Sequence, residues 1–343
     1  MKSLPRWIGN IGLLFGGVAL SLLVAELALR WTGYEYQPLK IGFGDVDQRS
    51  YHTFEDRHFV YDPNLLWRPR PGFEVFNAQG FRGPELPREK PAGEFRIFTV
   101  GDSNTLGSPE ANWPEDLHRI LRESCDRFQV VNAGVWGYSS DQGVLRLEEI
   151  LEYHPDMVLI SFGSNDAHPV SVPDKEYTAR SAWSRRLEGV TRPSRVARLA
   201  LAVSTHLTVT QTGEMTHRVS LEDYRRNLEE MVRRVGSAGA ATVLLTRPYR
   251  GKLPQVVRWK SFAHDYNAMT AEVADSLELP LVDLFTRFKD LDELFDDESH
   301  FNPEGHRLAA EIVYQRIQPL LREDGLASCL RPLVKGARAD DSE

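Results

Sequence analysis

The sequence predicts an α/β fold: a three-layer α/β/α sandwich with a five-stranded parallel sheet, preceded by one N-terminal transmembrane helix. Three observations lead to this prediction. From residue 95 onward, short apolar runs alternate with longer helical patterns. The runs are apolar throughout, which is typical of parallel strands covered by helices on both faces. A long uncharged segment stands at the N-terminus, ahead of all of them.

Five apolar runs and five helical patterns make up the expected sandwich. The runs lie at 95–100, 129–132, 157–162, 241–246 and 280–284, and the helical patterns at 114–123, 141–153, 221–235, 261–277 and 303–321. The helix expected from Leu221 illustrates the signal. Ser220 can cap its N-terminus, and apolar residues recur at i, i+4, i+7, i+8 and i+11 from Tyr224. We expect this apolar face to pack on the sheet.

The first 30 residues differ from the rest of the chain. Residues 7–25 carry no charge, and a helix that crosses a bilayer needs about 20 apolar residues. Lys2 and Arg6 precede them, as expected for an N-terminus that stays in the cytoplasm. A cleaved signal peptide is the alternative, although such peptides have shorter apolar cores. We expect an uncleaved signal anchor at 1–30, and both interpretations export the remaining residues.

The composition excludes several classes of protein. The chain has 343 residues, enough for one or two domains, and is 41% hydrophobic and 26% charged, unlike a disordered chain. Its net charge of −8 becomes −10 without residues 1–30, which hold three of the 41 basic and one of the 49 acidic residues. An acidic body does not favour nucleic-acid binding. Two cysteines, Cys125 and Cys329, exclude a disulfide scaffold, and either one disulfide bond or two free thiols fits them.

The remaining residues divide into three segments, one of which contains a long insertion. We expect a linker and wrap at 31–93, the main domain at 94–322, and a polar tail at 323–343. A long stretch at 167–219 separates the third and fourth strands, and it is either a solvated helical face or a lid that meets an anionic substrate or lipid head groups. Within about two dozen residues it holds Arg180, Arg185, Arg186, Arg192, Arg195 and Arg198.

Polar turns follow the first three apolar runs, where an open parallel sheet binds its ligands. They are Gly-Asp-Ser-Asn at 101–104, Asn-Ala-Gly at 132–134 and Gly-Ser-Asn-Asp at 163–166. Near the C-terminus, Asp297 and His300 lie three residues apart, just before a helical pattern. A carboxylate that close can hold one nitrogen of an imidazole and leave the other free as a base. Together these residue types suffice for acyl transfer through a serine nucleophile.

The four segments resemble the blocks of the SGNH hydrolases, also called GDSL esterases or lipases. Ser103, Gly134, Asn165 and His300 stand in the order of the family's four motifs, and the resemblance covers residues 94–322. It implies the flavodoxin-like SGNH form of the predicted sandwich, in a membrane-anchored bacterial type. The motif around the serine carries Asn104 where the family has leucine, a change expected to be harmless. The chain has no Gly-x-Ser-x-Gly, so the nucleophile elbow of the α/β-hydrolases is absent.

The resemblance also implies a role for each motif residue. Ser103 is expected to be the nucleophile, His300 its general base and acid, and Asp297 the group that orients His300. The expected oxyanion hole comprises the Ser103 and Gly134 backbone N–H groups and the Asn165 side-chain amide. An amide donates without adding charge, and glycine lets its backbone come close to the substrate.

Other polar residues near these motifs are expected to be structural. Asp102 and Asp166 should support their turns, and His306 should be a packed or capping residue of the last helix. The acidic and histidine residues at 296–306 lack HExxH or CxxC spacing, so a metal site is disfavoured there, and nothing calls for a cofactor. The turn-rich segment at 77–85 is expected to be structural too, with Gly80 in a turn and Phe81 in an apolar pocket.

The resulting hypothesis is a serine esterase, held by a single-pass anchor, with its catalytic domain in the periplasm or outside the cell. Its substrate would be an O-acylated envelope glycan, acetylated for example, or a lipid ester, and nucleic acid is not an expected partner. An O-acyltransferase acting on an envelope polysaccharide would use the same residues. A non-catalytic envelope scaffold or binding protein is the third alternative, against which the complete set of four motifs argues.

Overall fold

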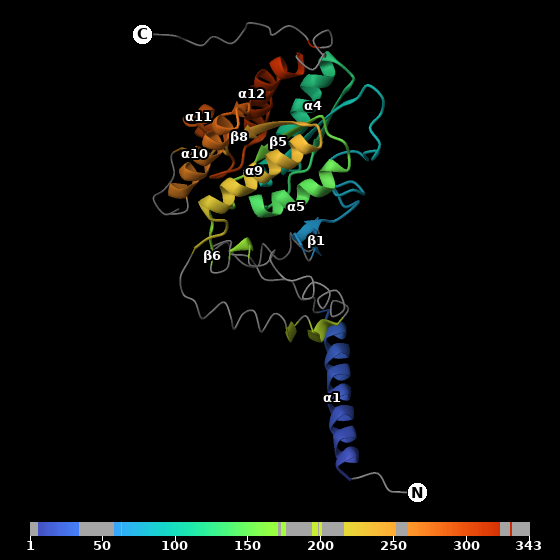
Figure 1. Cartoon of the computed structure of the whole chain (residues 1–343). Helices are drawn as coiled ribbons and strands as arrows, with labels where there is room; N and C mark the ends of the chain where they lie inside the picture. Colours follow the sequence, from blue (N-terminus) through green and yellow to red (C-terminus); the bar gives the residue numbers. More distant parts are fainter. Residues whose placement is uncertain are drawn as a thin grey trace.

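A five-stranded parallel sheet lies at the centre of the computed structural model, which describes residues 6–33, 58–62, 64–170, 173–175, 194–197, 199–200, 216–251, 260–322 and 330 (Figure 1). The strand order is β4-β3-β5-β8-β9, and every pairing is parallel. The strands are β3 (Phe95–Gly101), β4 (Phe128–Asn132), β5 (Met157–Ser161), β8 (Ala241–Leu245) and β9 (Leu281–Val282). The predicted α/β fold and its five-stranded parallel sheet are therefore confirmed.

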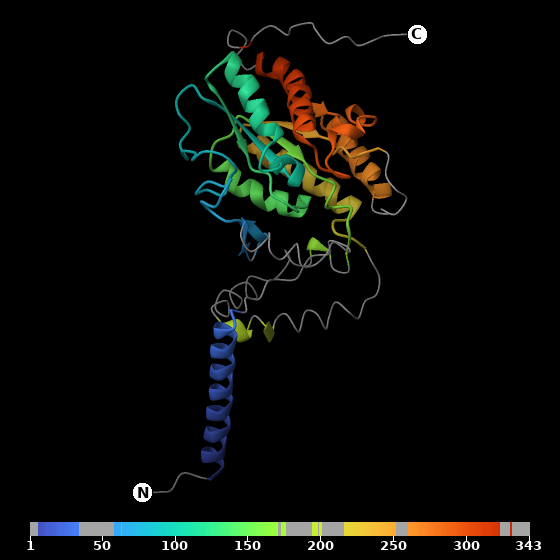
Figure 2. The ribbon, with the colours of Figure 1, turned by 180° about the vertical axis from the view of Figure 1, so that it is seen from behind.

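Helices cover both faces of the sheet, as Figures 1 and 2 show from opposite sides. On one face lie α4 (Trp113–Ser124) and α12 (Pro303–Leu321), and on the other lie α5 (Ser140–Leu151), α9 (Leu221–Ser237) and α10 (Lys260–Ser276). Successive strand side chains point to opposite faces, so Ile97 packs with the first pair of helices and Phe98 with the second group. This two-sided burial explains why the strands carry apolar residues on both faces.

Helix ends follow from capping residues in the sequence. Ser220 Oγ accepts the Asp223 N–H at 3.1 Å and caps α9, whose buried face includes Tyr224, Leu228 and Met231 as predicted. Near the C-terminus the sequence was less informative. The last strand was expected at 280–284, but β9 is two residues long, because Asp283 caps the short helix α11 (Leu284–Arg287) through the Thr286 N–H.

Helix α1 (Arg6–Trp31) lies outside the sandwich (Figure 1). Its residues 12–31 have a mean hydropathy of 2.1 and are long and apolar enough to cross a membrane, and none of that window is buried. A signal sequence would pass the same test, so α1 is a signal or an anchor. Near its end the Glu26 carboxylate accepts hydrogen bonds from Ser194 Oγ and the Val196 N–H, both at 3.0 Å, and Arg195 Nη1 donates to the Leu29 carbonyl at 2.8 Å.

The segment before the sandwich packs against it. Strands β1 (Phe59–Asp62) and β2 (Leu66–Pro69) form an antiparallel pair, and Trp67 Nε1 donates to the Trp136 carbonyl at 3.0 Å. Further along, Gly80 adopts a φ of 74°, and the buried Phe81 ring packs edge-on against two aromatic rings of the core. The structural role expected for Gly80 and Phe81 is thereby confirmed.

Two segments with sequence-based expectations are described in part. Strands β6 (Pro169–Val170) and β7 (Thr216–His217) form a small antiparallel sheet at the two ends of the 167–219 stretch. Arg180, Arg185, Arg186, Arg192 and Arg198 lie outside the described residues, so both interpretations of the stretch, a solvated helical face or a lid, stay predictions. Cys125 is disulfide-bonded, whereas Cys329 and nearly all of the tail lie outside the described residues.

Candidate active site

Ser103 stands on a tight turn at the carboxyl end of β3. Asp102 caps the four-residue helix α3 (Ser103–Leu106), and its Oδ1 accepts the Asn104 N–H at 2.9 Å, the turn-supporting role that was predicted. The turn passes so close to β5 that a Cβ at Gly101 would lie 2.5 Å from the Ser161 carbonyl oxygen. Glycine is therefore required there, and the close fit holds the start of α3 at the edge of the sheet.

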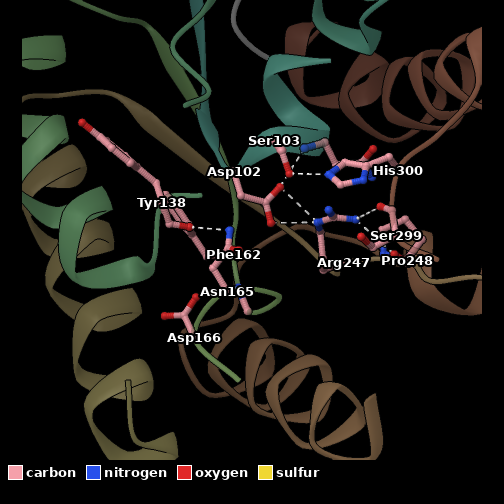
Figure 3. A network of polar contacts seen from close by, with 12 residues as sticks. Asp102, Ser103, Tyr138, Phe162, Asn165, Asp166, Arg247, Pro248, Ser299 and His300 are labelled. Carbon is pink, nitrogen blue, oxygen red and sulfur yellow. Dashed lines mark hydrogen bonds and ion pairs between the residues drawn. The ribbon is translucent and has the colours of Figure 1, made fainter. Parts of the chain in front are cut away.

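The structure brings Ser103, His300 and Asp297 into one hydrogen-bonded line. Ser103 Oγ lies 2.8 Å from His300 Nε2, although 197 residues separate them (Figure 3). On the other side of the ring, His300 Nδ1 lies 2.6 Å from Asp297 Oδ2. Because a carboxylate oxygen can only accept, Nδ1 carries the proton in this arrangement, and Nε2 is free to accept the Ser103 hydroxyl proton. The arrangement can move a proton from the serine to the imidazole.

Asp297 is held in the ionised form that this arrangement needs. Its Oδ1 accepts the N–H groups of Ser299 and His300, at 2.7 and 2.9 Å. Partial burial raises the pKa of the Asp297 carboxyl. The opposing effects of the His300 hydrogen bond, the His300 charge and the two backbone donors outweigh it, so the pKa lies well below its ordinary value. The carboxylate can therefore orient His300 across the whole neutral range.

Two of the three predicted oxyanion donors are available in the structure. Ser103 is the first residue of α3, and no acceptor for its N–H lies within the described parts of the chain. Asn165 follows β5, and its Nδ2 donates one hydrogen to the Tyr138 carbonyl at 2.9 Å (Figure 3). That bond fixes the direction of the amide and leaves its second N–H for another acceptor.

The third expected donor is already engaged. The Gly134 N–H donates to Asn132 Oδ1 at 3.0 Å, so it can reach a substrate oxygen only by sharing its hydrogen. Position 134 also needs glycine for a reason other than approach to a substrate. A Cβ there would lie 2.4 Å from the Leu106 nitrogen and 2.8 Å from the Thr105 carbonyl carbon, so the 132–134 turn packs directly on the backbone of α3.

Asp166 supports the Asn165 loop, as predicted. Its Oδ1 accepts the Ser140 N–H at 2.8 Å and its Oδ2 accepts the Gly163 N–H at 3.1 Å, which joins the loop to the first turn of α5. Burial raises the pKa of Asp166 to about 7, against the hydrogen bonds from Ser140 that favour the charged form. Asp166 does not contact Ser103 or His300 in these bonds, which is consistent with a structural role.

Arg247 is a site residue that the sequence did not identify. It follows β8, and its Nε lies 3.1 and 2.9 Å from the two carboxylate oxygens of Asp102 (Figure 3). Its Nη1 donates to the Ser299 carbonyl at 2.7 Å, and both charged side chains are 1% exposed. The rule that located Ser103, Gly134 and Asn165, a polar turn just after an apolar run, would also have selected Arg247.

The remaining histidine and acidic residues near His300 do not form a second site. His306 is buried and its ring packs edge-on against Phe301, so it is the packed residue that was predicted. Burial lowers the pKa of His306 to about 3. Among the residues that the structure describes, no three His, Cys, Asp or Glu side chains are grouped as metal ligands would be.

A serine–histidine–aspartate line at the carboxyl edge of a five-stranded α/β/α sandwich defines a class of hydrolases. Residues 99–308 match the profile of the GDSL-like lipase/acylhydrolase family, and the chain belongs to this family. Its activity class is accordingly that of a carboxylic ester hydrolase. The expected resemblance to the SGNH hydrolases is confirmed.

Similar proteins include both curated sequences and solved structures. The chain is 25% identical to the uncharacterized lipoprotein YqeF of Bacillus subtilis over 240 residues, which are 65% of this chain and 87% of that protein. A lipase/acylhydrolase from Enterococcus faecalis superposes with a TM-score of 0.44 at 24% identity, covering 71% of this chain and all of the other. The acetylxylan esterase Axe2 of Geobacillus stearothermophilus gives a TM-score of 0.45 at 17% identity, covering 65% of this chain and 94% of Axe2.

Proposed function

We propose that this chain is a serine esterase of the cell envelope in which Ser103 is the nucleophile. The observation that carries the proposal is the continuous line from Ser103 Oγ through both nitrogens of His300 to Asp297, with separations of 2.8 and 2.6 Å. These are hydrogen-bond distances for a nucleophile, its base and the group that orients the base.

The proposed reaction proceeds in two halves. Ser103 Oγ attacks the ester carbonyl carbon while its proton passes to His300 Nε2, and the carbonyl electron pair moves onto oxygen. The ester C–O bond then breaks, and His300 returns the proton to the departing alkoxide, which leaves an acylated serine. Water repeats the sequence, with His300 as base, and releases the free acid. Asp297 stabilises the imidazolium that forms in each half.

The negative oxygen of each intermediate needs donors that are fixed in advance. The Ser103 N–H and the second N–H of Asn165 supply them in this proposal, since Ser103 follows β3 and Asn165 follows β5 at the carboxyl edge of the sheet. The Gly134 N–H joins as a shared donor beside Asn132. Loss of one such donor typically lowers the rate by about 10²–10³-fold.

We further propose that α1 stays attached as a membrane anchor. Its contacts with residues 194–196 support this, because cleavage after residue 30 would remove the Glu26 and Leu29 acceptors. The lipoprotein name of the Bacillus relative agrees with an envelope location. The substrate is then an ester on an envelope glycan or lipid. Carbonate extraction and intact-mass measurement test the anchor: a soluble product that lacks residues 1–30 would refute it.

Ester hydrolysis by the full chain in detergent tests the reaction. Nitrophenyl esters of increasing acyl length serve as substrates, and an alkyl fluorophosphonate labels the activated serine. Ser103→Ala should abolish both signals, while Ser237→Ala, on an exposed part of α9, should retain them. Activity that survives Ser103→Ala would refute the mechanism. Adding an acetylated glycan with and without a sugar acceptor separates hydrolysis, which releases acetate, from acyl transfer.

A further inference from the structure

The residues on either side of Ser103 are bonded to the residues on either side of His300. Asp102 connects through Arg247 to the Ser299 carbonyl, and Asn104 connects directly to the Phe301 N–H (Figure 3 for the first connection). We refer to these two connections as the Arg247 strut and the Asn104 strut. They join a turn and a loop that are 197 residues apart in the chain.

The Arg247 strut is a buried ion pair with a second arm. Arg247 Nε is shared between the two oxygens of Asp102, while its Nη1 donates to the carbonyls of Ser299 and Pro248 at 2.7 and 3.1 Å. The backbone of Arg247 is fixed in turn, because Asn267 accepts its N–H at 2.7 Å and donates to its carbonyl at 2.8 Å. The planar guanidinium therefore spans a fixed distance between the two loops.

The Asn104 strut depends on the position where this chain departs from the family pattern. Asn104 Oδ1 accepts the Phe301 N–H at 3.2 Å, and both residues are buried. The Asn104 N–H is itself held by Asp102, so the two struts meet at that carboxylate. A leucine at position 104 has no acceptor and would leave the buried Phe301 N–H without its partner.

The struts are buried, whereas the pair that they align is not. The side chains of His300 and Asp297 are 38% and 55% exposed, and Asp297 accepts the N–H groups of Ser299 and His300 from its own loop. An exposed imidazole has few packing contacts to fix its distance from Ser103. We propose that Asn104 and Arg247 are positioning residues that set the separation between Ser103 Oγ and His300 Nε2. A misplacement of about 1 Å at a reacting centre can cost about 10²-fold in rate.

The inference rests on the proposed function, and its test uses the same full chain in detergent. Asn104→Leu should lower kcat for a nitrophenyl ester by at least about tenfold and leave KM nearly unchanged, because the strut lies behind the serine and not in the path of the substrate. Arg247→Lys keeps a charge beside Asp102 but lacks the forked reach to Ser299, so it should lower kcat in the same way. If Arg247→Lys does not fold, Asn104→Leu alone carries the test.

A matched control separates positioning from general destabilisation. Thr270→Val removes a buried hydrogen-bonding hydroxyl of α10 that pairs with Tyr224, and it should lower the melting temperature without lowering kcat. In a His300→Ala background, Asn104→Leu should have no further effect on the residual fluorophosphonate labelling rate, because a positioning residue acts through His300.

Two results would overturn the inference: a kcat within twofold of wild type for Asn104→Leu, or an equal fold loss with and without His300. Failure of the proposed function looks different. In that case the wild-type chain itself would show no hydrolysis or labelling above Ser103→Ala.

Discussion

Arg82, in the segment before the sandwich, contacts the end of the short helix that begins at Ser103. Its Nη1 donates to the carbonyls of Leu106 and Ser108 at 3.0 and 2.6 Å, and its Nη2 donates to the Pro109 carbonyl at 3.2 Å. Its own N–H donates to the Asn132 carbonyl at 2.9 Å. The guanidinium thus satisfies carbonyls at the end of α3 that the short helix cannot pair itself. We predict that Arg82→Met destabilises the fold and slows the reaction.

The size of the effect follows from the contacts. Hydrogen bonds to a charged group contribute about 1.5–3 kcal/mol each, and water can replace part of them because Arg82 is half-buried. A total loss of about 2–4 kcal/mol is expected. For a domain of this size each kcal/mol lowers the melting temperature by about 2–4 °C, which gives a decrease of roughly 4–16 °C. Displacement of α3 should lower kcat as well, by about tenfold or more.

Thermal unfolding followed by circular dichroism, together with nitrophenyl ester kinetics below the melting temperature, measures both effects. Arg88→Met is the matched control, because Arg88 is 66% exposed and pairs with the exposed Glu152. A surface pair of that kind contributes about 0–1 kcal/mol. A melting temperature for Arg82→Met that matches the Arg88→Met control, with unchanged kcat, would refute the reasoning.

Three further predictions concern the site. Asp297→Asn should lower kcat by about 10²–10⁴-fold, because an amide cannot hold the same tautomer of His300. Steady-state kinetics measure this effect, and a loss of kcat below tenfold would contradict the prediction. Gly134→Ala should lower both the melting temperature and kcat, since its Cβ would lie 2.4 Å from the Leu106 nitrogen and overpacking costs about 1–3 kcal/mol; unchanged values would show that the turn can relax. The pKa of Asp166 is raised to about 7 in the fold, so its contribution to stability is complete below its unfolded value and is lost as the pH rises through 7. Urea unfolding should therefore show Asp166→Asn less stable than wild type near pH 5, with the difference shrinking toward pH 8, and a pH-independent difference would argue against the raised pKa.

Most strands and helices of the sandwich could be predicted from the sequence, because the pattern that identifies each one lies within a short stretch of residues. Strands covered on both faces carry apolar residues on both faces, and helices are marked by capping residues such as Ser220 and by a 3.6-residue period. The prediction was weaker where the elements are too short to show a period. Helices α3 and α11 have four residues each, and β9 has two. The capping residues Asp102 and Asp283 fix where the two helices begin, and Asp283 also ends β9.

The sequence by itself determined the order of strands and helices along the chain, the motif residues, and the placement of three of the four motifs at strand ends. The tertiary structure alone decided which distant groups meet. No spacing in the sequence indicates that Arg247 pairs with Asp102, that Asn104 reaches the Phe301 N–H, or that Arg82 closes the end of α3. Such contacts depend on how separate loops are brought together at one edge of the sheet. A hydrogen bond is decided within tenths of an ångström, and only the packed core fixes loop positions to that degree.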